Sequence, residues 1–365
     1  MKKLLLYLLV SLFLNLNSFA ITHPEGRYPD TITDGPYIFN VNGTLTVKWI
    51  KNSILREDFI VPENFAEIKK KFNLSCNYKD LTDSYLQKSN YSQNYRKVDS
   101  ISVISDVHGK YNIYINLLKA MGIIDNNLKW KFGRGHLVVL GDIFDRGDMV
   151  TEVLWHLFGL EKQAAKAGGM VHVLLGNHEV LVLSKDLRYI NEKYEKVEAI
   201  SNTEYFDLYS ENSVLGRWLR SKPVAITIND IIFVHGGISI GMVYRNFTIK
   251  QINQIFSDNI VGKEMPVNNE NERQMFLNDN YGPVWYRGYF TDTSLCESRL
   301  DSILDFYNKK HIVVGHTASE DIKTQFNNKI FGVDAGIAID QSGGMLIYKN
   351  GFFYKGYITG KRIKF

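Results

Sequence analysis

The chain has 365 residues, of which 45% are hydrophobic and 22% charged, and its formal net charge is +4. This composition is that of an ordinary globular protein with enough residues for a full-sized core. The mixed, nearly balanced charge argues against nucleic acid or a membrane surface as a partner. We therefore expect one large domain, alone or with a smaller attachment.

The first twenty residues have the pattern of an export signal. Lys2 and Lys3 precede an apolar run over residues 4–14, and Ser18 and Ala20 supply the small residues that a signal peptidase needs. The apolar run is too short to span a bilayer comfortably. We therefore expect a cleaved signal peptide over residues 1–20, export to the periplasm or full secretion, and no stable membrane insertion afterwards.

Residues 21–96 are predicted to form an N-terminal extension, for which the sequence indicates no function. Two short apolar runs flank Asn42-Gly43, a dipeptide that suits a type I′ turn, and predict a β-hairpin over residues 37–49. A helix is predicted at 65–72, and the polar tract 75–94 is expected to be a loop.

Cys76 and Cys296 are the only cysteines. They are too few for a disulfide framework, although an oxidising compartment would permit one bridge between them. Two separately buried thiols are the other possibility. The sequence leaves both open.

From residue 100 onward, short aliphatic or β-branched runs end in polar, glycine-containing turns. Helical patterns at 111–121 and 149–167 separate the first three runs, so the order begins β-α-β-α-β. This order predicts a layered α/β domain over residues 97–365. The five runs are 101–104, 137–140, 171–175, 231–234 and 312–314.

Two insertions interrupt this core, at about 183–221 and at about 242–302. Loops of this length in a compact domain are usually functional or independently structured. Near the end of the chain, Asn350-Gly351 predicts a second hairpin over residues 345–357.

A polar cluster directly follows each of the five apolar runs. Because ligands bind beyond the carboxyl ends of the strands in open α/β sheets, we expect these clusters to converge on one site. The clusters are Ser105-Asp106-Val107-His108-Gly109, Gly141-Asp142-Ile143-Phe144-Asp145-Arg146-Gly147, Gly176-Asn177-His178-Glu179, His235-Gly236-Gly237 and Gly315-His316-Thr317.

The residue types in these clusters predict a metal site. Two carboxylates, an asparagine and three histidines form a mixed oxygen and nitrogen set that suits divalent transition metals better than calcium. Six such groups exceed the needs of one open catalytic ion and favour two ions about 3.5–4 Å apart, bridged by a shared carboxylate. Such a pair suits displacement at phosphorus, because it stabilises charge on both the attacking and the leaving oxygen.

Three of the clusters also resemble a known family. Asp106-x-His108-Gly109, Gly141-Asp142-x-x-Asp145-Arg146-Gly147 and Gly176-Asn177-His178-Glu179 look like the signature of the phosphoprotein phosphatases within the calcineurin-like metallophosphoesterases. The export signal, the segment 282–288 and the ending 315–317 are most similar to the bacterial Shewanella-like protein phosphatases. The resemblance covers about residues 100–344. It implies a metallophosphoesterase fold, with a central β-sandwich flanked by helices, and it leaves the N-terminal extension with its predicted β-hairpin uncovered.

The resemblance implies the metal ligands residue by residue. One divalent ion is expected on Asp106 and His108, Asp142 is expected to bridge, and the second ion is expected on Asn177, His235 and His316. Manganese is the first choice, and iron and zinc also suit the set. The expected nucleophile is a metal-bound hydroxide.

The resemblance also implies the catalytic residues. His178 is expected to protonate the leaving oxygen, with Asp145 orienting its ring. Arg146, Arg287 and Asn177 are expected to bind the phosphate oxygens. Arg287 lies in the second insertion, and Arg217 and Arg220 are its possible substitutes.

Other polar residues are interpreted as structural. Glu179 is expected to hold its loop in place, and Asp334 is expected to have a structural role. The remaining histidines are interpreted as surface residues or hydrogen-bonded core residues: His23, His136, His156, His172 and His311.

The predicted function is a dinuclear-metal phosphomonoesterase that acts on a phosphorylated protein or a small phosphomonoester. The resemblance to the Shewanella-like branch implies a preference for phosphotyrosine. A nucleotide or diadenosine-polyphosphate hydrolase is an alternative, because the aromatic segment 285–290 could stack a base. A catalytically silent metal-binding module is a second alternative, which predicts loss of the proton donor or the phosphate-binding arginines.

Overall fold

A computed structural model of the chain describes residues 31–83, 93–263 and 271–365. The predicted signal peptide, residues 1–20, lies outside them. Residues 32–365 form one unit. In the described part of the chain, no helix has the length and apolar character needed to cross a bilayer.

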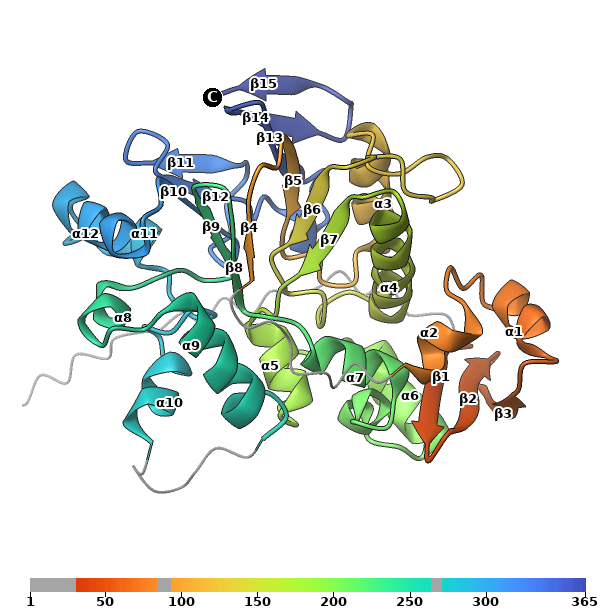
Figure 1. Cartoon of the computed structure of the whole chain (residues 1–365). Helices are drawn as coiled ribbons and strands as arrows, with labels where there is room; N and C mark the ends of the chain where they lie inside the picture. Colours follow the sequence, from red (N-terminus) through yellow and green to blue (C-terminus); the bar gives the residue numbers. More distant parts are fainter. Residues whose placement is uncertain (1–30, 84–92, 264–270) are drawn as a thin grey trace, which may run out of the picture. The chain divides into compact units, whose positions relative to one another are not determined.

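Two six-stranded sheets form the centre of this unit (Figure 1). In the first sheet the order is β15 (Arg362–Lys364), β14 (Phe352–Tyr357), β13 (Gly344–Lys349), β5 (Ser100–Ile104), β6 (His136–Val139) and β7 (Met170–Val173). In the second it is β11 (Lys323–Gln325), β12 (Ile330–Gly332), β10 (His311–Val314), β9 (Ile231–Val234), β8 (Ala225–Ile228) and β4 (Asn94–Tyr95).

The two sheets pack face to face as a sandwich. Val103 and Val138 of the first sheet belong to the same buried cluster as Phe233 and Phe331 of the second. A second and larger cluster joins the outer faces to the helices. The expected β-sandwich flanked by helices is therefore confirmed.

The strands that lead to the polar clusters are buried and largely parallel. β5, β6 and β7 pair in parallel, as do β9 and β10. All residues of β6 and β9 are buried, which explains why these runs are continuously apolar and do not alternate. The five predicted runs are all confirmed as strands.

Helices flank the sandwich as predicted, with α3 (Tyr111–Ala120) and α4 (Val150–Lys166) within one residue of the expected bounds. The first insertion holds α6 (Glu192–Ser201), the 3-10 turn η1 (Tyr205–Tyr209) and α7 (Val214–Arg220), after α5 (Asn177–Leu183). The second holds α8 (Ile240–Tyr244), α9 (Ile249–Ile255), the π-helical turn η2 (Phe256–Ile260), α10 (Glu272–Leu277), α11 (Gly288–Thr291) and α12 (Glu297–Tyr307).

The N-terminal extension is a three-stranded antiparallel sheet of β1 (Asp34–Val41), β2 (Thr44–Lys51) and β3 (Ile54–Ile60). The predicted hairpin is confirmed, and Asn42 and Gly43 both have the positive φ of a type I′ turn, 51° and 86°. This sheet contacts the first insertion, where Asn40 N–H donates to Asn212 O at 2.8 Å.

The prediction of a loop over residues 75–94 is partly wrong. The helix α1 (Phe65–Lys71) is where it was expected, but a short helix α2 (Tyr78–Thr82) and the strand β4 follow it. Asn77 N–H donates to Asp80 Oδ2 at 2.7 Å and caps α2, while Leu81 is fully buried. Because Leu81 is the one buried residue of the five in α2, the helix has no repeating apolar pattern from which the sequence could predict it.

The second hairpin, β13 with β14, is confirmed around Asn350 and Gly351. The cysteines are both free, with Cys76 buried and Cys296 exposed. The disulfide that the sequence left open is therefore absent.

Candidate metal centre

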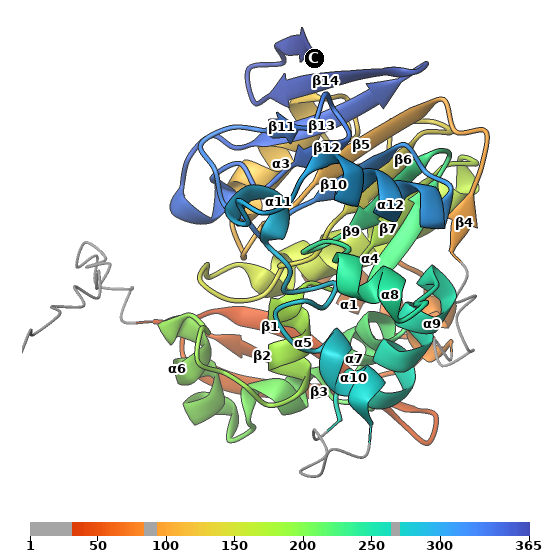
Figure 2. The ribbon, with the colours of Figure 1, turned by 90° about the vertical axis from the view of Figure 1, so that its left-hand side faces the viewer.

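The polar clusters converge at the carboxyl ends of strands from both sheets. Asp106, Asp142 and Asn177 follow β5, β6 and β7 of the first sheet, while His235 and His316 follow β9 and β10 of the second. In both ribbon views, α5 lies below the sandwich, where β7 leads into it (Figure 2). All of these side chains are buried.

Asp142 lies at the centre of this arrangement. Its Oδ2 lies 3.2 Å from His235 Nε2, 3.7 Å from His108 Nε2 and 3.8 Å from His178 Nε2. His235 Nε2 also lies 2.9 Å from the side-chain oxygen of Asn177. Carboxylate, amide and imidazole donors thus face a common point.

Two groups of potential ligands share this aspartate. His108, Asp142 and His178 form one group, and Asp142, His235 and His316 form the other, with one donor atom from each residue within 4.8 Å of the others. A carboxylate common to two groups is what a bridged pair of ions requires. Such a bridge was expected of Asp142.

Asp106 was predicted to be a metal ligand and His178 the proton donor, but the first group of potential ligands contains His178 and not Asp106. Asp106 Oδ2 accepts hydrogen bonds from Ser105 Oγ at 2.5 Å and from His316 N–H at 3.0 Å, while His178 occupies the place in the first group. His178 is therefore placed either to bind an ion or to donate a proton.

Each of the three predicted histidine ligands has one ring nitrogen committed to a backbone carbonyl. A carbonyl only accepts, so that nitrogen carries a hydrogen, and in the neutral ring the other nitrogen has the lone pair that can bind a metal ion. The bonds are His108 Nδ1 to Phe144 O at 2.6 Å, His235 Nδ1 to Leu140 O at 2.9 Å and His316 Nε2 to Trp285 O at 3.1 Å.

The free nitrogen of His108 fits a cation directly. His108 Nε2 is buried and has no hydrogen-bond partner, an arrangement that is costly unless something else satisfies it. Burial lowers the pKa of His108 to about 3 and that of His316 to about 2, so both rings are in the neutral form that binds metals.

Asp142 and His235 stabilise each other's charged forms. Burial disfavours the ionised form of Asp142, but the charges of His235 and His178 outweigh burial and hold its pKa well below the usual range. Burial also opposes protonation of His235, yet Asp142 and Asp106 raise its pKa to about 9. A metal ion on His235 Nε2 would displace that proton, so metal binding should release protons.

The backbone of the site is unusual. Six of the predicted site residues adopt left-handed conformations although none is glycine, and such conformations concentrate at functional sites. Neighbouring glycines allow close approach, because a Cβ on Gly176 would overlap Asp142 Oδ1 and one on Gly315 would overlap Ser105 Oγ. The φ values are 52° for Asp106, 44° for His108, 55° for Asp142, 70° for Asp145, 63° for Arg146 and 63° for His316.

Glu179 holds this backbone in place, as predicted. Its two buried carboxyl oxygens accept four backbone N–H groups from both sides of the site, those of Asp142, Ile143, Phe144 and Gly176. The residue therefore positions Asp142 without facing the metal centre.

His178 is paired as a proton donor requires. Its Nδ1 lies 2.5 Å from Asp145 Oδ2, and its Nε2 lies 3.5 Å from Arg146 Nη2. Burial opposes protonation of the ring, but Asp142 and Asp145 outweigh burial and raise its pKa. The ring is thus oriented by Asp145 and its second nitrogen faces the phosphate-binding candidate Arg146.

The second insertion brings Arg287 to the site. Arg287 donates to the backbone carbonyl of His316, and its Nη2 lies 3.4 Å from His316 Nδ1. The two possible substitutes are directed elsewhere, because Arg217 donates to Asn40 O and Arg220 to Tyr209 O.

The comparisons with known proteins agree with this geometry. The family model for calcineurin-like phosphoesterases matches residues 100–320. The chain belongs to this family. The match contains all six predicted metal ligands, together with His178, Asp145, Arg146 and Arg287. Members of the family use divalent metal ions, and the two ligand groups around Asp142 are this phosphoesterase's candidates for holding them.

Individual relatives and solved structures show which phosphatases of the family this chain resembles. A crystal structure of a cold-active protein-tyrosine phosphatase from a psychrophilic Shewanella species is 37% identical, with a TM-score of 0.83, and covers 92% of this chain and 99% of that chain. Shewanella-like protein phosphatase 1 of Plasmodium berghei (strain Anka) is 29% identical over 277 residues, 73% of this chain and 74% of that protein. A Saccharomyces cerevisiae serine/threonine phosphatase shares the fold alone, with 17% identity and a TM-score of 0.52.

The Shewanella likeness extends beyond the catalytic region. The match to the Shewanella structure covers 92% of this chain, which is more than residues 100–365 make up. It therefore includes part of the N-terminal extension. The sequence resemblance had left this extension uncovered.

Two residues near the site were not expected there. Burial and the charges of Asp106 and Asp142 raise the pKa of Asp334 to about 8, so this carboxyl lies in the field of the phosphoesterase centre. The ring of Tyr189 contacts that of His178. Asp334 follows the strand β12 as the predicted site residues follow theirs, but it was interpreted as structural. Tyr189 lies in an insertion and had no sequence signal.

The histidines predicted to be structural have partners within the core or at the surface. His172 Nε2 lies 2.9 Å from His136 Nδ1, and His156 Nδ1 lies 2.8 Å from Tyr114 OH. His311 bonds a backbone carbonyl, and His23 lies outside the described residues.

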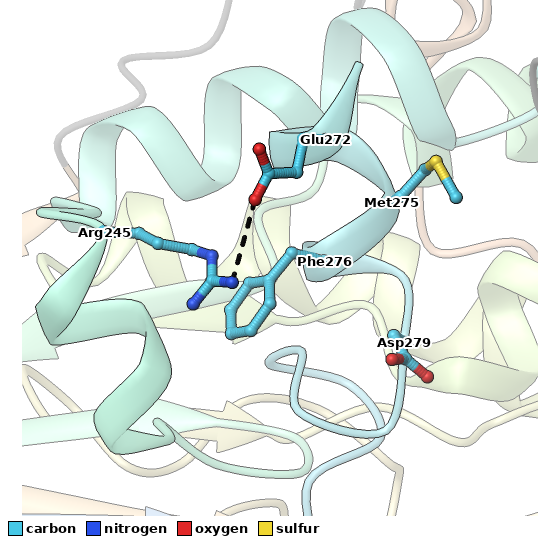
Figure 3. Close-up of a pocket in the computed structure, with 5 residues that line it drawn as sticks. All are labelled: Arg245, Glu272, Met275, Phe276 and Asp279. Carbon is cyan, nitrogen blue, oxygen red and sulfur yellow. Dashed lines mark ion pairs between the residues drawn. The ribbon is translucent and has the colours of Figure 1, made fainter. Parts of the chain in front are cut away.

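A separate hollow lies on the second insertion (Figure 3). None of its lining residues is a predicted site residue. Arg245 lies over the ring of Phe276 with its guanidinium carbon 4.1 Å from the centroid, and its Nη2 lies 3.8 Å from Glu272. The lining is Arg245, Glu272, Met275, Phe276 and Asp279.

Proposed function

We propose that this phosphoesterase is a two-metal protein phosphatase that prefers phosphotyrosine. The observation that carries the proposal is a carboxylate, Asp142, shared by two groups of potential ligands beside an oriented imidazole, His178. The Shewanella protein-tyrosine phosphatase, at 37% identity, supports the choice of a phosphorylated protein and of tyrosine.

The ligand set supports a pair of divalent ions. We assign His108 and Asp106 to one, Asn177, His235 and His316 to the other, and Asp142 to both. Manganese is the first choice, with iron or zinc possible, because availability often decides among them. When bound, the ions supply Lewis acidity, which activates water and neutralises charge on the phosphate.

The chain's own side chains would then position the substrate and move one proton. Arg146 and Arg287 present guanidinium forks to the phosphate oxygens, and Asn177 adds an amide donor. His178 would act as the imidazolium and give its Nε2 proton to the leaving oxygen. Asp145 accepts from Nδ1–H, orients the ring and stabilises its positive charge.

The structure weakens both alternatives. In the segment 285–290, Tyr286 and Tyr289 are buried, and Tyr289 OH bonds both backbone groups of Ile238, so these two rings form a wall and are not free to stack on a base. Trp285 is half-buried, and its ring packs edge-on against that of His316 with 5.9 Å between the centroids. A silent module predicts a damaged proton donor, but His178 and Asp145 are paired.

We also propose that the protein is exported. The support is the pattern of residues 1–20, with small residues at Ser18 and Ala20. N-terminal sequencing of the protein made in its own cell should find the chain beginning near residue 21. An intact N-terminus would refute export by a cleaved signal.

The function is tested by p-nitrophenyl phosphate turnover of the full chain, after chelation and after Mn²⁺ is restored. Asp142→Asn should abolish the metal-restored activity, whereas Asp301→Asn, which changes a solvent-accessible side chain of α12, should keep it. Activity that survives both chelation and Asp142→Asn would contradict the metal mechanism. Faster cleavage of a phosphoserine peptide than of its phosphotyrosine counterpart would contradict the tyrosine preference alone.

A further inference from the structure

We propose that Tyr189 recognises the leaving group of the substrate and makes the enzyme selective for aromatic phosphomonoesters. This inference rests on the proposed phosphatase function and adds to it a residue that binds the substrate's ring.

The ring of Tyr189 lies against the candidate proton donor. Its centroid is 5.2 Å from that of His178, with 55° between the ring planes. His178 is buried, whereas Tyr189 is 46% exposed. The half-buried Trp285 also has a ring contact with a predicted site residue, His316. Among the described aromatic residues that are more than one-third exposed, only Tyr189 has such a contact. It therefore presents aromatic surface to solvent beside the catalytic imidazole.

The backbone fixes this ring relative to the phosphate-binding loop. Tyr189 O accepts the backbone N–H of Arg146 at 3.1 Å. Asn191 Nδ2 donates to Arg146 O at 2.8 Å, so the insertion holds Arg146 through both its N–H and its C=O. The position of Tyr189 is thus tied to the residues that would bind the phosphate and protonate the ester.

A neighbouring ion pair also limits where the ring can lie. Arg188 Nε lies 2.9 Å from Asp186 Oδ1, and the guanidinium carbon of Arg188 is 5.9 Å from the Tyr189 centroid. With His178 on one side and Arg188 near another, the remaining exposed surface is where a substrate ring would pack.

The chemistry of the leaving group explains the expected selectivity. His178 Nε2 must hydrogen-bond the ester oxygen that leaves, so the group attached to that oxygen starts next to His178. In phosphotyrosine this group is a flat ring joined directly to the oxygen, and aromatic rings pair favourably at centroid distances of about 4.5–7 Å. In phosphoserine it is a single methylene, which offers no aromatic face.

The test compares phosphotyrosine and phosphoserine versions of one peptide, using the full chain loaded with Mn²⁺. Tyr189→Ala should lower kcat/KM for the phosphotyrosine peptide about two- to twelvefold, the factor expected for one lost aromatic pair. It should leave the phosphoserine peptide within about twofold. Tyr189→Phe, which keeps the ring, should retain the wild-type ratio of the two rates. Tyr244→Ala removes an exposed tyrosine of α8 that is not among the predicted site residues and should change neither rate.

The outcomes separate this inference from the proposed function. An equal loss on both peptides would mean that Tyr189 only supports the structure, and no loss on either would mean that its ring does not meet the substrate; each result overturns the inference. A wild-type enzyme inactive on both peptides and on p-nitrophenyl phosphate would instead overturn the phosphatase function, and the inference with it. Because the Tyr189–Arg146 bond is a backbone bond, all variants retain it.

Discussion

Replacing Glu179 with glutamine tests whether one buried carboxyl group holds the metal-binding backbone. Oε1 accepts the N–H groups of Ile143 and Phe144 at 2.7 and 3.2 Å, and Oε2 accepts those of Asp142 and Gly176 at 2.8 and 2.7 Å. The side chain is fully buried, so water cannot replace these bonds.

Glutamine has nearly the same volume, but one of its terminal atoms is an NH₂ group that cannot accept. Whichever oxygen is replaced, two backbone N–H groups lose their acceptor and face another donor. An unsatisfied buried polar group costs about 1–3 kcal/mol, so we expect the free energy of unfolding to fall by about 2–6 kcal/mol. Mn²⁺ affinity should fall too, because these bonds hold Asp142 in its left-handed conformation.

The loss is measured by urea unfolding followed by tryptophan fluorescence, with chelator present so that metal binding does not contribute to stability. Glu192→Gln is the matched control, because Glu192 is exposed on α6 and its ion pair with Lys196 is a surface pair. The control should change stability by less than about 0.5 kcal/mol. A Glu179→Gln protein that unfolds at the same urea concentration as the wild type would refute the reasoning.

Three further predictions concern the proton donor, a buried ion pair and the cysteines. His178→Asn should lower kcat about 10²- to 10⁴-fold, with a smaller loss on p-nitrophenyl phosphate than on a phosphoserine peptide, because nitrophenolate leaves without a proton; equal losses would argue against His178 as the acid. Lys193→Met should cost about 3–5 kcal/mol in urea unfolding, because it leaves Asp34 buried without the ammonium group now 3.0 Å away. Adding Asp34→Asn should restore part of that loss, and a fully additive double variant would contradict the pairing. A thiol reagent should modify one cysteine in the native protein and two after unfolding, because Cys296 is exposed and burial raises the pKa of Cys76 to about 12; two reactive thiols in the native state would be inconsistent with this fold.

Much of the site was predictable because its signals are local. Each apolar run and the polar turn after it lie within a few residues, so the strand ends carrying Asp106, Asp142 and His235 could be recognised from the chain alone. The two Asn-Gly hairpins are local in the same way, since both depend on a dipeptide that accepts positive φ. These features need no information about which strands become neighbours.

Tertiary structure decided which distant residues meet. The sequence favoured Arg287 through its resemblance and kept Arg217 and Arg220 as possible substitutes. Only the folded insertions bring Arg287 to the backbone carbonyl of His316 and direct the other two to Asn40 O and Tyr209 O. Tyr189 reaches His178 because its segment bonds Arg146, a contact between residues more than forty positions apart. The pairing of the two sheets and the short helix α2 depended in the same way on long-range burial. Periodicity reports which face of an element is apolar, but it contains no information about the partner that covers that face.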